Sequence, residues 1–272
     1  MAAALLLPLS PMLFRFLPKL LYAQVRSLYL FTFGIFSSRN RFLIYQIATL
    51  LGWDGKRRAE LLRKIPVVEV LSDPLALTLH NPAPKGGNVT FLELAIIVDL
   101  ARSRKAEQIF EIGTFDGRTA RNLAAILPVG GRVHTLDLPA ELLDDTEFKL
   151  AKGEEAFVEK PVQGSQFLGK PEAGKIQQLL GDSAKFDFSP FWGKMDMVFV
   201  DGSHAYEYVW TDTLNALKLL KPEGGLILWH DYTGAWPELT HALNELAARE
   251  ARLRDMRHIE GTTLAYLEVP SA

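Results

Sequence analysis

From Gln108 onwards, short apolar runs alternate with segments of helical periodicity, and this alternation constrains the fold more than any other feature of the sequence. Apolar runs that are each followed by a helix are typical of a parallel sheet covered on both faces. The runs that we expect to be strands are Gln108 to Ile112, Arg132 to Leu136, Lys175 to Leu180, Met195 to Val200 and Gly225 to Trp229. The sequence therefore predicts an α/β fold.

Helical segments separate these strands, and a close pair of further strands ends the chain. The expected helices are Thr90 to about Ser103, Arg118 to Ile126, one within Glu141 to Glu154, Tyr206 to Leu220 and Pro237 to Arg249. Thr90 and Glu93 have capping-box spacing, which places the first helix start. The strand candidates Met256 to Ile259 and Thr263 to Val269 lie too close together for anything but an antiparallel hairpin. We expect a Rossmann-like, seven-stranded, mostly parallel sheet with this C-terminal hairpin at one edge and helices on both faces.

The N-terminal segment is apolar and basic. Residues 1–53 contain Arg15, Lys19, Arg26, Arg39 and Arg41 but no acid, and each uncharged block is shorter than the roughly 20 residues that span a bilayer. Three interpretations stay open: a helical extension packed on the core or on a second subunit of a homodimer, a segment lying on a membrane surface, or a targeting peptide. The expected location is cytoplasmic, either free or peripheral at a membrane.

The chain is expected to have three parts: the extension at residues 1–56, a helical and loop lead-in at 57–88, and a core at 89–272. The boundary before the core is a Pro-, Gly- and Asn-rich stretch from His80 to Asn88. The net charge of -2 argues against a nucleic-acid partner. Because the chain has no cysteine, any metal must be held by oxygen and imidazole ligands.

A glycine-spaced turn follows the first core strand. Within Phe110 to Thr119, Gly113 allows a tight turn and a close approach of a ligand to the backbone. The GxGxxG spacing of dinucleotide sites is missing, which disfavours a nicotinamide-linked oxidoreductase. About twenty residues further on, Asp137 ends the next strand, where a carboxylate can bind ribose hydroxyls. The turn predicts a nucleoside cofactor without phosphates.

Polar residues also follow the next three strands: Gly181, Asp182 and Ser183, then Asp201 to His204, then His230 to Tyr232. Ligands bind at the carboxyl edge of such sheets, so these residues are expected to surround one crevice. Two roles stay open for the acids and imidazoles, namely binding a divalent ion or supplying a base with a pKa near neutrality.

The stretch from Gly181 to Tyr232, with the E-I-G-x-x-x-G motif at Glu111 to Gly117, resembles class I S-adenosylmethionine-dependent methyltransferases. The resemblance covers Lys85 to Val269 and is to the branch of catechol and caffeoyl-coenzyme A O-methyltransferases and cephalosporin-hydroxylase-like proteins. It implies S-adenosylmethionine as cofactor, with a closing loop at Gly86 to Thr90. The implied cofactor-binding residues are Gly86, Asn88, Glu111, Gly113, Thr114, Gly117, Asp137, Asp182, Ser183 and Asp201.

The same resemblance implies a catalytic and metal site. Asp201 matches the family's metal-binding Asp, and His204 occupies the position of its lysine base. His230 and Asp231 fall on its Asp-Asn metal pair, so Asp201, His230 and Asp231 are the expected ligands of a divalent ion such as Mg²⁺. We expect Asp201 and His204 to be catalytic in methyl transfer to a hydroxyl oxygen of a small-molecule, glycan or lipid-linked acceptor. A metal-independent methyltransferase and a non-catalytic, membrane-associated S-adenosylmethionine-binding protein are the alternatives.

Overall fold

The computed structural model describes residues 11–37, 40–41, 43–44, 47–48, 59–84, 86–158 and 162–271. The chain forms two compact units, Met1–Arg57 and Arg58–Ala272. Residues 1–10 and 49–58, which include the start of the apolar extension and the predicted boundary after residue 56, lie outside the described residues, as does Lys85 at the start of the resemblance.

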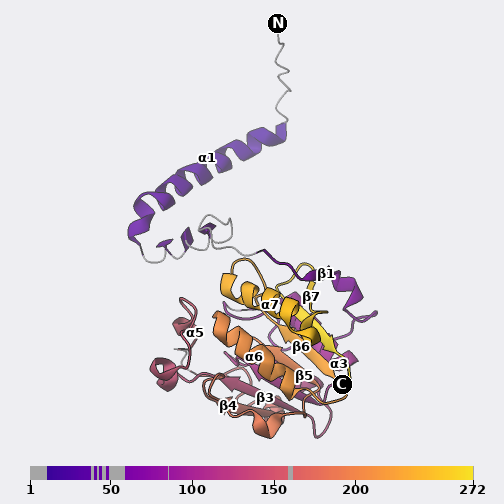
Figure 1. The fold of residues 1–272 in the computed structure, drawn as a ribbon. Coiled ribbons are helices and arrows are strands. Elements are labelled where there is room, and N and C mark those ends of the chain that lie inside the picture. The colour runs from indigo at the N-terminus through magenta and orange to yellow at the C-terminus, as the bar shows by residue number, and fades with distance from the viewer. Residues whose placement is uncertain are drawn as a thin grey trace. The chain divides into compact units, whose positions relative to one another are not determined.

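The first unit contains the long helix α1, Pro11–Phe31, followed by a 3-10 turn at Phe33–Phe36 (Figure 1). This helix lies within the predicted extension of residues 1–56. It carries exposed apolar side chains, among them Leu21, Val25 and Leu28. No helix in the described ranges has the length and apolar character needed to cross a membrane.

The second unit is built on an eight-stranded sheet with the order β1-β7-β8-β6-β5-β2-β3-β4. Neighbouring strands are parallel except where β8 pairs with β6 and with β7. The strands are β1 Arg63–Ile65, β2 Gln108–Ile112, β3 Arg132–Asp137, β4 Ile176–Leu180, β5 Met197–Val200, β6 Gly225–Trp229, β7 Arg257–Ile259 and β8 Ala265–Val269. The chain runs from β2 to one side of the sheet and from β5 to the other, so the strand order reverses between them.

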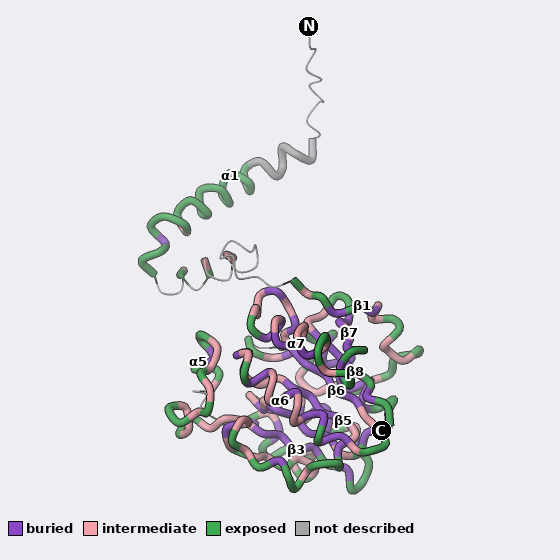
Figure 2. The backbone as a smooth tube through the Cα atoms, in the orientation of Figure 1, coloured by how far each residue is buried: buried purple, intermediate pink, exposed green. Residues whose placement is uncertain are grey.

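Helices cover both faces of this sheet. They are α3 Phe91–Ser103, α4 Arg118–Ile126, the short α5 Glu155–Val158, α6 Tyr206–Leu219 and α7 Pro237–Arg249. On one face, an apolar cluster joins α6 and α7 to strand residues such as Val198. On the other face, a second cluster joins α3 and α4 to the next residues along the strands, such as Phe199. Because side chains alternate between the faces of a strand, the central strands are buried on both sides (Figure 2).

The Rossmann-like, mostly parallel fold with an antiparallel C-terminal hairpin is confirmed, with two corrections. The sheet has eight strands because the lead-in adds β1, which pairs with β7 and takes the edge position predicted for the hairpin. The helix expected within Glu141 to Glu154 is wrong: a 3-10 turn spans Ala140–Asp145, and α5 begins only at Glu155. Backbone amides there bond to side chains instead of helical carbonyls, as Glu147 does to Asp182 and Ala151 to Glu154.

Candidate active site

A cavity of about 310 Å³ opens at the carboxyl ends of β2 to β6. Open α/β sheets bind ligands at this edge, beside the point where the strand order reverses. The predicted site residues that line the cavity are Asn88, Gly113, Asp137, Asp182, Ser183, Asp201, His204, His230 and Asp231. The fold thus brings most of the predicted site together.

Gly113 lines the cavity where the end of β2 lies against the end of β5. Its φ is +102°, and a Cβ placed on it would lie 1.9 Å from the carbonyl oxygen of Asp201. Its own amide donates to the carbonyl of Leu136 at 2.8 Å. Only glycine lets the end of β2 pass so close to the end of β5.

Four of the predicted cofactor residues do not line the cavity. Gly86 does not line the cavity but its neighbour Gly87 does, and Gly117 is the N-cap residue of α4 and lies against the ring of Phe167. Glu111 and Thr114 are buried, and both bond to the Thr135 hydroxyl, at 2.5 and 2.6 Å. Burial, reinforced by nearby carboxylates, raises the pKa of Glu111 well above its ordinary value.

Asp182 lines the cavity, yet its carboxylate already accepts backbone hydrogen bonds. Its Oδ2 accepts from the amide of Glu147 at 2.6 Å and its Oδ1 from that of Ala184 at 2.9 Å. Asp182 therefore fixes the chain that follows β3 against the end of β4.

Arg118, which the sequence interpretation passed over, anchors the loop before α3. Its side chain is buried and donates to the carbonyls of Asn81 and Val89, both at 2.7 Å, and of Pro82 at 3.0 Å. This loop carries Asn88 to the cavity. Arg118 directly follows Gly117 of the glycine motif, which was its only signal in the sequence.

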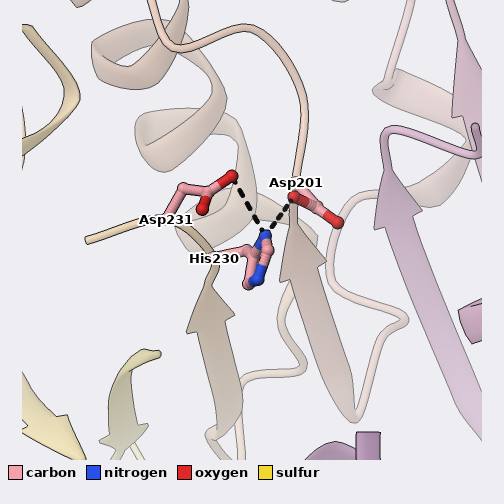
Figure 3. Close-up of side chains that lie close together, drawn as sticks. All are labelled: Asp201, His230 and Asp231. Carbon is pink, nitrogen blue, oxygen red and sulfur yellow. Dashed lines mark hydrogen bonds and ion pairs between the residues drawn. The ribbon is translucent and has the colours of Figure 1, made fainter. Parts of the chain in front are cut away.

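The polar residues that follow β5 and those that follow β6 lie side by side, as the sequence predicts. His230 lies between Asp201 and Asp231 at the adjacent ends of β5 and β6 (Figure 3), with its Nδ1 2.9 Å from Asp201 Oδ1 and 3.2 Å from Asp231 Oδ2. Its Nε2 lies 3.4 Å from Glu93 Oε2. Candidate donor atoms of Asp201, His230 and Asp231 all lie within 4.8 Å of one another.

His204 is held between two carboxylates. Its Nδ1 bonds to Glu154, its Nε2 lies 2.9 Å from Asp231 Oδ2, and its ring stacks on Trp236 with centroids 3.9 Å apart. Burial opposes a charge on this ring, but the bonds to Asp231 and Glu154 outweigh it and raise the pKa of His204 to about 9. Against the same opposing burial, His230 and His204 hold the pKa of Asp231 far below its usual range.

Three further residues of this network escaped the sequence interpretation. Glu93 was visible as part of a capping box, but its second role toward His230 depends on the pairing of distant segments. Glu154 and Trp236 lie outside regular structure, where no periodicity marks a side chain that turns toward the cavity.

The sequence of the central strands β2 to β6 and the residues after them matches a known family model. Residues 110–232, from β2 through the residues that follow β6, match the family described as a methyltransferase domain.

The chain is also similar to individual proteins. The mouse protein named catechol O-methyltransferase domain-containing protein 1 is 28% identical over 190 residues, which cover 65% of this chain and 65% of that protein. Among solved structures, the Streptomyces achromogenes O-methyltransferase TomG in complex with SAM is 22% identical, with 68% of this chain and 82% of that chain covered and a TM-score of 0.48. The Bacillus cereus O-methyltransferase in complex with SAH is 21% identical, covers 62% of this chain and 74% of that chain, and has a TM-score of 0.45.

Proposed function

We propose that this protein transfers a methyl group from S-adenosylmethionine to a hydroxyl oxygen of its acceptor. The observation that carries the proposal is that one cavity is lined both by the predicted ribose-binding Asp137 and by the acid–histidine cluster of Asp201, His204, His230 and Asp231. The methyltransferase domain and the O-methyltransferase names of the relatives support it.

The cavity fits the cofactor. Gly113 leaves room that a Cβ would remove, and Asp137 and Ser183 stand at the ends of β3 and β4 for the ribose and the base. Asn88 lines the cavity too, and within the described part of the chain its buried Oδ1 has no hydrogen-bond partner. That oxygen suits an ammonium donor such as the methionine end of the cofactor carries. Once bound, the cofactor supplies the electrophilic methyl group.

We propose that His204 accepts the proton of the acceptor hydroxyl at Nε2, the nitrogen that faces Asp231. Because the bonds to Asp231 and Glu154 raise the pKa of His204 to about 9, the ring is mostly protonated near neutral pH, so only its neutral form takes the proton and methyl transfer should become faster as the pH rises towards 9. The stack on Trp236 fixes the plane of the ring, so that the basic nitrogen has one direction. Positioning of the two reactants supplies most of the remaining rate.

Divalent-metal assistance is a second part of the proposal. The donor set of Asp201, His230 and Asp231 fits a divalent ion, and Glu93 on the far side of His230 would hold its Nδ1 toward the carboxylates. A bound ion lowers the pKa of a coordinated hydroxyl. If methyl transfer were unaffected by chelators and by Asp201→Asn, the enzyme would be metal-independent.

Binding of the cofactor can be tested before any acceptor is known. Calorimetric titration should show binding of S-adenosylhomocysteine but not of NAD, with loss of binding in Asp137→Ala and full binding in Asp144→Ala, a matched change at an exposed carboxylate away from the cavity. Labelled S-adenosylmethionine incubated with catechols, glycans and lipid extracts then identifies the acceptor class. Binding without any methylated product would favour the non-catalytic alternative.

We further propose that the N-terminal segment lies on an anionic membrane surface, where it would bring the domain near lipid-linked acceptors. Its support is the combination of exposed apolar side chains on α1 with basic residues and no acid in residues 1–53. Co-sedimentation with phosphatidylserine vesicles, but not with phosphatidylcholine vesicles, is expected. Binding that is equal to both, or absent, would contradict this part of the proposal.

A further inference from the structure

The segment of residues 148–158, between β3 and β4, forms one wall of the cavity. It contributes Leu150, Glu154, Phe157 and Val158 to the lining. Apart from the single turn of α5 it has no regular structure, so its position depends on side-chain contacts. A wall held in this way can open more easily than the strands around it.

Glu154 makes the polar contacts between this wall and the loop after β5. Its Oε1 accepts from the backbone amide of His204 at 2.5 Å and faces the ring Nδ1 of the same residue. Its Oε2 accepts from the Ser203 hydroxyl at 2.6 Å and from the amide of Ala151 at 2.8 Å. Although the segment lies at the surface, Glu154 is only 5% exposed.

A second contact fastens the same wall by packing. The ring of Phe157 meets that of Phe115 edge-on with centroids 5.9 Å apart, and a Cβ on Gly87 would lie 2.9 Å from the Phe157 ring. The wall therefore touches the glycine turn, the loop before α3 and the loop of His204, and the ring of Phe148 meets that of Tyr208 on α6 edge-on with centroids 5.4 Å apart. Of these contacts, the one to His204 carries hydrogen bonds to a carboxylate, which are about twice as strong as neutral ones.

We propose that Glu154 is a latch and a positioning residue: it holds residues 148–158 closed over the cavity and, with the same carboxylate, fixes the ring of His204. Closure of the wall and orientation of the proposed base are thereby one event. A cofactor that enters under the wall must open the latch, and its closing excludes water and turns Nε2 of His204 toward Asp231. This inference rests on the proposed function of the same cavity.

Limited trypsin digestion tests the latch directly, because Lys149 and Lys152 are exposed cleavage sites within the wall. In the unliganded protein, Glu154→Ala should be cleaved there roughly 10- to 100-fold faster than wild type, as expected for losing hydrogen bonds to a buried charge. Glu155→Gln is the matched control, since the neighbouring carboxylate is exposed and accepts a hydrogen bond from the amide of Gly153 within the wall itself, which the glutamine can keep. Equal cleavage in both variants would overturn the latch.

Steady-state kinetics test the positioning role. Glu154→Gln keeps an oxygen for the His204 amide but replaces the carboxylate at Nδ1, so kcat should fall at least tenfold while KM for S-adenosylmethionine stays within about twofold. Unchanged kcat, or a parallel change in Glu155→Gln, would overturn this role. Failure of wild type to bind S-adenosylhomocysteine in calorimetry would instead overturn the proposed function, and the digestion of the unliganded protein would still decide whether Glu154 closes the wall.

Discussion

Replacing Gly113 by Ala should damage both the fold and the cofactor cavity. The new Cβ would lie 1.9 Å from the carbonyl oxygen and 2.5 Å from the carbonyl carbon of Asp201, and the residue would have to keep a φ of +102°. The left-handed backbone costs about 1–2 kcal/mol for a residue with a Cβ, and overpacking adds about 1–3 kcal/mol. Together they predict a loss of about 2–5 kcal/mol from a typical total of about 5–15 kcal/mol.

The assay is urea unfolding together with calorimetric titration of S-adenosylhomocysteine. Gly174→Ala is the matched control, because Gly174 has no positive φ and nothing within 4 Å of its added Cβ, so its change should stay within about 0.5 kcal/mol. Gly113→Ala should also bind the ligand more weakly, since Asp201 must move. If both variants unfolded at the same urea concentration, the close approach of Gly113 to the Asp201 carbonyl would not require glycine at this position.

Two further perturbations test the surroundings of the cavity. Arg118→Met leaves three backbone carbonyls without their donor and should cost about 2–4 kcal/mol and weaken S-adenosylhomocysteine binding, whereas Arg132→Met, at an exposed site, should do neither in the same unfolding and titration assays. Because the pKa of His204 rises from 6.5 in the unfolded chain to about 9, its pairing stabilises the fold fully below pH 6.5 and is lost as the pH rises through 9. The gap in unfolding free energy between wild type and His204→Gln should therefore shrink by about 3 kcal/mol from pH 6 to above pH 9, and a gap that stayed constant would contradict the assigned pairing.

The sequence predicted the central part of the fold well because its signals are local. The run Gly225 to Trp229 and the helices Arg118 to Ile126 and Pro237 to Arg249 have in the structure the bounds that periodicity gave them. The strand β1 could not be found in this way. It has three residues, of which only Ile65 is buried, and it exists because β7 offers it a partner almost 200 residues later.

In the candidate site, too, the residues that local signals mark were predicted and those brought in by distant contacts were not. Asp201, His230 and Asp231 follow predicted strands, so the geometry of a parallel sheet was enough to bring them together. Glu154 joins them from an irregular segment, and only the folded chain shows that its carboxylate reaches the loop of His204. The sequence predicts which residues follow the strands, but not which side chains of an irregular segment between strands turn toward the cavity.

Tyr232 gives the chain ahead of the core a mechanical path to this site. Its hydroxyl oxygen accepts hydrogen bonds from the backbone amides of Leu61 at 2.7 Å and Leu62 at 3.0 Å, and its proton is donated to Asn244 Oδ1 at 2.6 Å. Tyr232 is also the covalent neighbour of Asp231, whose φ of +60° leaves little freedom to absorb a displacement. A displacement of Leu61 and Leu62 would thus be passed to a phenol one peptide bond away from the carboxylate that links the two histidines.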